Sequence, residues 1–304
     1  MLRALFIGLS TSRALRSFAE NSPMGQKMSR RFVAGTTVED LMAATQEVNR
    51  RGMSVSVDNL GENVTNVEEA RHSEKLYHQL LDLVTERKLD ANVSLKLTHM
   101  GLDVDEKLSR EIVSGLVEHA ARVNSFVRVD MEGSPYTQKT LDFVKELHER
   151  YPGKLGGVIQ AYLYRSEKDV EDLLSKRIRI RLCKGAYREP ASIAFQKKAE
   201  VDANYVKLTK MLLKSGVYHG IATHDEKIIR QTTAFAKAEK IPSEAFEFQM
   251  LHGIRRDLQE QLVKDGWRMR VYIPFGTEWY PYFMRRLAER PANVLFIAKN
   301  FFRR

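Results

Sequence analysis

Four residues near the end of the chain have types and spacings suited to holding a small anion. They are Tyr282, Arg285, Arg286 and Glu289, which share one face if this segment is an α-helix. Two adjacent guanidinium groups can clamp a carboxylate through paired hydrogen bonds as well as charge. The alternative is an ordinary solvated face on which arginine and glutamate side chains pair with one another.

The elements that must position these groups are indicated by eight short β-branched or apolar runs. They cover residues 53–58, 92–98, 126–131, 155–161, 178–183, 218–223, 245–250 and 268–273. The last run is expected to end at Pro274, and amphipathic helical patterns separate the runs. Strict alternation of strand and helix over about 250 residues predicts a closed (β/α)₈ barrel. No GxGxxG turn follows the first run, which disfavours a doubly wound dinucleotide-binding sheet.

The helical patterns cover residues 68–87, 106–122, 138–150, 168–174, 194–214, 226–238 and 255–264. Residues 1–48 precede the first strand and are predicted to form an N-terminal helical arm. No internal linker is visible, so residues 49–304 are predicted to form a single barrel domain.

Nearly every predicted strand carries polar residues near its end or just after it, and functional groups of such barrels gather at the carboxyl ends of strands. The candidates at these positions, which also include Gly185, Ala186 and Leu251, are in chain order Glu62, Lys96, Asp130, Gln160, Arg181, Lys184, Gly185, Ala186, Tyr187, Thr223, His224, Gln249, Leu251 and Tyr272. Structural alternatives exist for several of them. Lys96 could pair with Asp130 in a buried ion pair, His224 could be a hydrogen-bonded core histidine, and Arg181 could bridge acids between strands.

Composition narrows the class of protein. The chain has 304 residues and one cysteine, Cys183, which excludes an internal disulfide and any multi-cysteine metal site. The net charge of +10 is concentrated at the ends, since residues 255–304 carry eleven Lys or Arg against five Asp or Glu. No basic stripe with interleaved aromatics is present, so a nucleic acid is disfavoured as a partner. Anionic lipid or an acidic substrate suits the basic ends better.

The first 20 residues are amphipathic and contain Arg3, Arg13 and Arg16 before the first acid, Glu20. Three interpretations stay open for them: a transit peptide, an interfacial helix and a helix packed on the domain. The transit peptide is the least favoured, because few residues precede the predicted fold. No run of 18 uncharged apolar residues occurs, so no membrane span is predicted.

Six segments in order resemble the proline dehydrogenase family, from about residue 50 to 295. They read LKLTHMG, VRVDMEGS, IRLCKGAYRE, ATHDE, FEFQML and VYIPFGTEWYPYFMRRLAE. The chain is most similar to the short monofunctional bacterial type. The resemblance implies a flavin-binding (β/α)₈ barrel whose last helix sits over the barrel top. It also implies FAD-dependent oxidation of L-proline to Δ1-pyrroline-5-carboxylate, the first step of proline catabolism.

The resemblance assigns substrate roles to ten residues. Arg285, Arg286 and Lys96 would hold the proline carboxylate, and Tyr272, Tyr282, Leu251 and Tyr187 would surround the ring. Asp130 and Glu289 would orient these groups and balance their charge. Glu62 would pair with Arg285 when substrate is absent, forming a gate. Exchanging Glu62 for alanine should then change proline binding without removing FAD.

The same resemblance also indicates which residues would contact the flavin. Arg181 would lie near flavin N5, where a fixed cation favours the reduced, anionic ring. The other expected cofactor contacts are Gln160, Lys184, Gly185, Ala186, Thr223, His224 and Gln249. Gly185 suits close approach of the backbone to a phosphate-bearing ligand. The motifs do not distinguish FAD from FMN, and they do not indicate the oligomeric state.

The implied mechanism needs no nucleophile. The cations Arg285, Arg286 and Lys96 would lower the pKa of the proline amine, and holding Cδ against flavin N5 would promote hydride transfer. Electrons would pass to a membrane quinone. The expected location is cytoplasmic, with weak peripheral contact at the inner face of the membrane through the basic ends.

Two other classes are weighed against this one. A Schiff-base aldolase on the same barrel would use Lys96 or Lys184, and a non-catalytic lipid- or nucleic-acid-binding protein would use only the basic ends. Neither accounts for the charged face of the last helix. Arg188 stands where some family members have an aromatic residue, so flavin packing there is expected to differ. The bulk of Tyr272 disfavours hydroxyproline as substrate.

Overall fold

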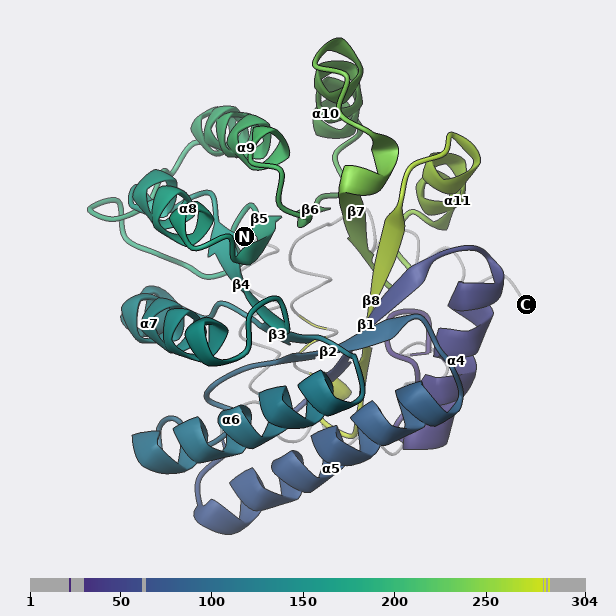
Figure 1. Ribbon diagram of the computed structural model, residues 1–304, viewed down its shortest axis with the longest axis vertical. Helices are drawn as coiled ribbons and strands as arrows, with labels where there is room; N and C mark the ends of the chain where they lie inside the picture. Colours follow the sequence, from purple (N-terminus) through teal and green to yellow (C-terminus); the bar gives the residue numbers. More distant parts are fainter. Residues whose placement is uncertain (1–21, 23–29, 62–63, 281, 283, 285–304) are drawn as a thin grey trace.

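The computed structural model describes residue 22 and residues 30–61, 64–280, 282 and 284. Within these ranges eight strands form a closed barrel in sequence order, and every neighbouring pair is parallel. Closure is made by β8 against β1, from the pair Ser54–Arg270 to the pair Asn59–Phe275. Figure 1 shows the helices arranged around the outside of this barrel.

The strands are β1 (Ser54–Asn59), β2 (Ala91–Leu95), β3 (Val127–Val129), β4 (Leu155–Gln160), β5 (Arg179–Cys183), β6 (His219–Ala222), β7 (Phe246–Leu251) and β8 (Met269–Phe275). The helices are α4 (Val38–Arg50), α5 (Val67–Glu86), α6 (Glu106–Arg122), α7 (Ser134–Arg150), α8 (Ser166–Ser175), α9 (Lys198–Lys214), α10 (Glu226–Ala238) and α11 (Arg256–Lys264), with a short 3₁₀ helix, η1 (Ser243–Ala245). The predicted (β/α)₈ barrel is confirmed.

The predicted end of the last strand was wrong, because β8 continues through Pro274 to Phe275. A proline usually interrupts a sheet because it lacks the N–H that a ladder needs. Here the ladder with β7 has already ended at the pair Leu251–Tyr272. The carbonyl of Pro274 instead accepts the backbone N–H of Ala34 at 2.9 Å. The N–H that Pro274 lacks is therefore not needed for pairing with β7.

Alternation along the strands separates an apolar outside from a polar inside. In β5, Ile180 and Leu182 are fully buried in the main hydrophobic core with the helices, and Arg181 alternates with them. The guanidinium of Arg181 hydrogen-bonds side chains from β1, β2 and β7, so it lies inside the barrel. The helices complete the outer layer with one apolar face each, as in α5, whose first turn is capped by the Asn66 side chain.

Most residues at the two ends of the chain fall outside the described ranges. Of the predicted N-terminal arm, Ser22 and the residues from 30 onward are described, and α4 ends the arm just before β1. A further helical segment begins at Trp279, of which Tyr280, Tyr282 and Met284 are also described. The division at residue 48 therefore stays a prediction. None of the helices within the described ranges is long and apolar enough to cross a membrane.

Because the protein buries neutral histidines such as His219, we expect its free energy of unfolding to fall in mild acid. Burial, together with the charge of Arg128, lowers the pKa of His219 to about 3. Its ring accepts the backbone N–H of Ile180 and contacts Ser215, both at 3.0 Å. Since the unfolded state binds the proton first, stability is present above about pH 6.5 and falls as the pH drops. At about pH 5.5 this costs about 1.4 kcal/mol for one such histidine.

Urea unfolding at about pH 7.5 and 5.5 measures this effect. His219→Gln keeps a side-chain acceptor for Ile180 and should lose part of the pH dependence. His72→Gln, at an exposed position of α5, is the matched control and should keep it. Equal pH dependence in both variants and the parent would contradict the prediction.

Candidate active site

Arg181 lies at the centre of the candidate site, inside the barrel and toward the carboxyl ends of the strands. Its Nη1 donates to Asp130 Oδ1 at 2.6 Å and to Ser94 Oγ at 3.1 Å. Its Nη2 donates to Ser56 Oγ at 3.0 Å, and its Nε donates to Gln249 Oε1 at 2.5 Å. The partners come from β1, β2, β7 and the end of β3, so the guanidinium is fixed in position and orientation.

Asp130 supplies the counter-charge for Arg181 and ties it to β8. Besides Arg181, its Oδ1 accepts the Ser94 hydroxyl at 2.7 Å, and its Oδ2 accepts the Tyr272 hydroxyl at 2.9 Å. The Arg181 guanidinium also lies over the Tyr272 ring, 5.2 Å from its centroid. A buried arginine, a carboxylate and a phenol, all three among the residues predicted for the site, are thereby brought together.

Lys96 follows β2 and binds Asp58 rather than Asp130. Its Nζ lies 3.1 Å and 3.3 Å from the two carboxylate oxygens of Asp58. The predicted alternative of a Lys96–Asp130 ion pair was therefore wrong. Asp58 belongs to β1, which pairs directly with β2, whereas Asp130 is engaged by Arg181, Ser94 and Tyr272. Burial raises the pKa of the Asp58 carboxyl, although Lys96 opposes this and Asp130 adds to it.

Most residues predicted for a cofactor lie at or just after the ends of β4, β5 and β6, which are consecutive in the barrel, while Arg181 lies within β5 and Gln249 within β7. Gln160 is buried, donates to the Glu132 carbonyl at 2.9 Å and accepts the Ala186 N–H at 3.2 Å. His224 Nε2 accepts the backbone N–H of Leu251 at 3.0 Å. His224 is therefore hydrogen-bonded as the structural alternative predicted, but it is half-buried and does not belong to the core.

Lys184 is held between two carboxylates at this side of the barrel. Its Nζ lies 2.5 Å from Asp202 Oδ1 and 3.0 Å from Asp225 Oδ2. The backbone N–H of Asp225 also donates to Thr223 Oγ1 at 3.1 Å. This cluster fixes the loop between β6 and α10 beside the loop that follows β5.

Gly185 is required by its backbone and by its neighbour. Its φ is +123°, a conformation that side-chain-bearing residues rarely adopt. A Cβ added at this position would lie 2.3 Å from the Tyr162 ring. Within the described residues Gly185 closely approaches an aromatic ring that follows β4, and its predicted approach to a phosphate-bearing ligand stays a prediction.

An apolar wall covers the opposite side of the mouth. Leu251 packs against a small buried cluster formed by Phe32, Val33, Leu60, Ile254, Trp279, Tyr280, Tyr282 and Met284. Because Leu60 follows β1 and Ile254 follows β7, the start of the last helical segment lies at the carboxyl ends of these strands. Tyr187 is not a member of this cluster and has 39% of its surface exposed. Glu62, Arg285, Arg286 and Glu289 fall outside the described residues.

Comparison with known proteins identifies the family. A family model described as proline dehydrogenase matches residues 41–299. This chain belongs to the proline dehydrogenase family. Proline dehydrogenase 1 of Bacillus subtilis subsp. natto is 40% identical over the whole of both chains. Proline dehydrogenase 2 of Bacillus subtilis strain 168 is 42% identical, over 98% of this chain and 97% of its own length.

Solved structures give the same answer for the fold. Proline utilization A from Bdellovibrio bacteriovorus, inactivated by N-propargylglycine, superimposes with a TM-score of 0.83 at 26% identity. The match covers 91% of this chain and 34% of the larger protein. The chain matches the short Bacillus proteins over nearly their whole length, so it is similar to this short type of the proline dehydrogenase family.

Several side chains of this proline dehydrogenase family member were missed as site residues. Ser56, Asp58 and Ser94 bind the central cations, and Glu247 binds Gln249. The signal that could have found them is the alternation of the strands. Each lies two positions along its strand from another inward-facing residue, as Ser94 does from Lys96 and Glu247 from Gln249. Positions two apart share one face of a strand.

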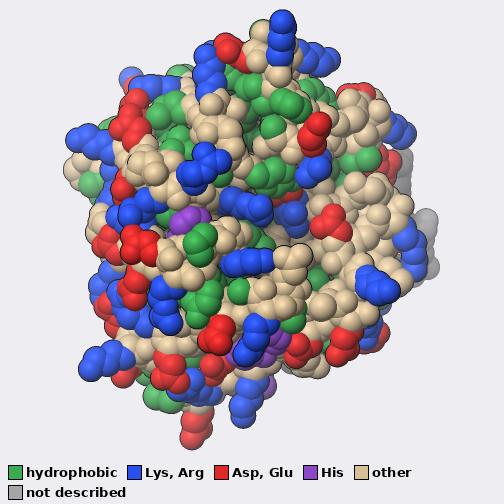
Figure 2. Space-filling view, viewed as in Figure 1, with side chains coloured by type: hydrophobic (Ala, Val, Ile, Leu, Met, Phe, Trp, Pro, Cys, Tyr) green, Lys and Arg blue, Asp and Glu red, His purple; other side chains and the backbone are tan. Residues whose placement is uncertain are grey.

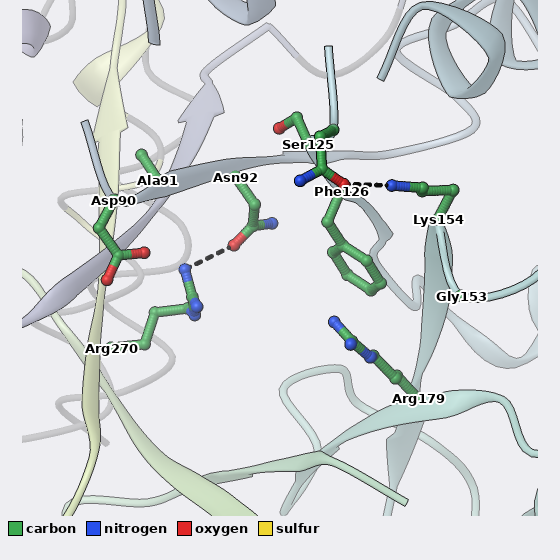
Figure 3. Close-up of a pocket in the computed structure, with 10 residues that line it drawn as sticks. Asp90, Ala91, Asn92, Ser125, Phe126, Gly153, Lys154, Arg179 and Arg270 are labelled. Carbon is green, nitrogen blue, oxygen red and sulfur yellow. Dashed lines mark hydrogen bonds between the residues drawn. The ribbon is translucent and has the colours of Figure 1, made fainter. Parts of the chain in front are cut away.

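The opposite end of the barrel carries a separate polar pocket, lined by Asp90, Ala91, Asn92, Asn124, Ser125, Phe126, Gly153, Lys154, Arg179 and Arg270. Figure 3 shows Arg179 and Arg270 entering it from two sides. Figure 2 shows Lys and Arg side chains around a hollow near the middle of the visible face. Because the pocket lies at the amino ends of the strands, it is not where barrels of this kind place their chemistry.

Proposed function

We propose that this protein oxidises L-proline to Δ1-pyrroline-5-carboxylate, with FAD as the hydride acceptor. The observation that carries the proposal is the buried Arg181, fixed by Asp130, Gln249 and two serines in the centre of the barrel. A cation fixed in this way is suited to stabilise negative charge that develops on a bound ring. Family membership supports proline as the substrate.

The residues of the β4–β6 side fit a flavin nucleotide. Arg181 on β5, Lys184 after β5 and His224 after β6 offer donors or ring nitrogens along two neighbouring strands and the loops that follow them, which suits an extended group that carries phosphates. Gln160, Gly185, Ala186, Thr223 and Gln249 would complete this side. When bound, the flavin would supply the acceptor for the two electrons and the hydrogen removed from proline.

The β7–β8–β1–β2 side fits a small amino acid. Lys96 offers a cation at the mouth, Tyr272 lies beside Arg181, and Leu251 belongs to the apolar wall with Tyr282. We propose that Arg285 and Arg286 join Lys96 on the substrate carboxylate and that Tyr187 closes the ring pocket. Nearby cations disfavour the protonated amine, so the nitrogen can keep its lone pair while hydrogen leaves Cδ.

The other proposed roles concern charge and electron acceptance. Glu289 would balance the two arginines, and Glu62 would act as the substrate gate. A membrane quinone would reoxidise the flavin, reached by weak peripheral contact of a cytoplasmic protein. The net charge of +10 supports attraction to anionic lipid.

The absorption spectrum of the purified protein, before and after anaerobic addition of L-proline, tests the proposal. A flavin band that bleaches with proline is the expected result. A flavin band indifferent to proline would reject the substrate, and a colourless protein that FAD cannot reconstitute would reject the cofactor. Acid release of the cofactor followed by chromatography distinguishes FAD from FMN.

A Schiff-base aldolase is the competing enzyme on this barrel. It needs a lysine whose amine is free to attack a carbonyl. The ammonium groups of Lys96 and Lys184 are instead ion-paired with Asp58, Asp202 and Asp225. Covalent trapping with borohydride and a carbonyl substrate would bring the aldolase back.

A further inference from the structure

The orientation of one amide decides how Arg181 is held. Gln249 Oε1 accepts the Nε–H of Arg181 at 2.5 Å, and Gln249 Nε2 donates to Glu247 Oε1 at 2.5 Å. An amide rotated by half a turn would present its NH₂ group to Arg181, and two donors would then face each other. A carboxylate accepts and never donates, so Glu247 excludes the rotated form.

Glu247 is itself fixed by one group on β8 and one that directly precedes β6. Its Oε1 also accepts the Nε–H of Arg270 at 2.7 Å, and its Oε2 accepts the Tyr218 hydroxyl at 2.8 Å. Arg270 continues to the Val55 carbonyl at 2.7 Å and to Asn92 at 2.9 Å, the latter drawn in Figure 3. The carboxylate is thus anchored from both sides.

The charge state of Glu247 suits this role. Only 3% of the residue is exposed, and burial alone would raise the pKa of its carboxyl. The charge and hydrogen bond of Arg270, helped by Tyr218 and Gln249, outweigh burial and lower that pKa. Glu247 is therefore ionised at neutral pH and can only accept.

We infer that Glu247 is a positioning residue that, through the Gln249 amide, fixes the Arg181 guanidinium for the reaction. This inference rests on the proposed function, in which Arg181 faces the flavin ring. Glu247 touches neither substrate nor cofactor in this arrangement. With the amide free to rotate, Arg181 would lose its Nε acceptor and stabilise the reduced ring less well, so the flavin reduction potential should fall.

Glu247→Gln tests the inference, because a glutamine at 247 can face Gln249 with either end of its amide. Tyr218→Phe is the matched control, since it removes a partly buried hydrogen bond to the other oxygen of the same carboxylate. Both variants should lower the unfolding midpoint. Only Glu247→Gln should lower the flavin reduction potential, with kcat for proline reduced about 10-fold and KM changed less than about 2-fold.

Gly220→Ala provides a second route without altering any charge. A Cβ at Gly220 would lie 2.3 Å from Gln249 Nε2, so the amide must move. The reduction potential should shift in the same direction as in Glu247→Gln. If Glu247→Gln fails to fold, an unchanged potential in Gly220→Ala would still overturn the inference, because Glu247 is inferred to act through this amide.

A flavin-free readout separates this inference from the proposed function. In apoprotein containing ¹⁵N-arginine, the Nε–H resonance of Arg181, assigned with Arg181→Lys, should move in Glu247→Gln and stay in Tyr218→Phe. An unmoved resonance with an unchanged potential would overturn the inference while the flavin function stands. Equal shifts in both variants would overturn it as well, since they would show general loosening. A moved resonance in a protein that binds no flavin would overturn the proposed function alone, and with it the link to the potential.

Discussion

Arg181→Lys is expected to lower kcat/KM for proline about 10²- to 10³-fold, the usual cost of losing a fixed charge-stabilising donor. Lysine keeps the positive charge but cannot reproduce the planar fork that binds Asp130, Ser94, Ser56 and Gln249 together. Steady-state kinetics with an artificial electron acceptor, after reconstitution with excess FAD, measures the loss.

Arg179→Lys is the matched control for this substitution. Arg179 lies two residues earlier on β5, so it points to the same face of the strand. It lines the polar pocket at the amino end of the barrel, where it stacks on Phe126, with 5.3 Å between guanidinium carbon and ring centroid. Activity within about 3-fold of the parent is expected. Equal losses in both variants would show that β5 was disturbed as a whole.

Arg270→Met is expected to cost about 3–5 kcal/mol of folding free energy, because it leaves Glu247 as a buried carboxylate without its counter-charge. Both side chains are mostly inside the barrel, with 15% and 4% of their surfaces exposed. Methionine fills much of the same volume, so the loss reports the missing ion pair more than a cavity. Urea unfolding at about pH 8 measures the difference.

The sign of the pH dependence checks the cause. With Arg270 present, the pKa of Glu247 is lowered, and without it burial should raise that pKa. The folded variant would then bind a proton that the unfolded chain releases, so lowering the pH toward about 6 should restore stability relative to the parent. Adding Glu247→Gln to Arg270→Met removes the unpaired charge and should recover at least about 1 kcal/mol. No recovery by either route would contradict the ion-pair account.

Local patterns in the sequence determined the architecture. Alternating strand residues such as Ile180, Arg181 and Leu182 already separate an apolar outer face from a polar inner one, and eight such runs with helices between them predict a barrel. The same reasoning placed Lys96, Asp130, Arg181 and Tyr272 at one end, because parallel strands share the direction of their carboxyl ends. These conclusions depend on neighbours along the chain and therefore survive without tertiary information.

Only the closed barrel decided which of these groups pair. Arg181 binds Ser56, 125 residues away, and Gln249, 68 residues away, contacts that no local pattern specifies. By residue type alone, Lys96 could pair with Asp58 or with Asp130. The adjacency of β1 and β2 places Asp58 within its reach. Inside a barrel every inward side chain can meet residues from several strands, so the partner is set by register and by competition for acceptors. The strand pattern predicts which side chains face inward, and closure of the barrel determines which of them contact one another.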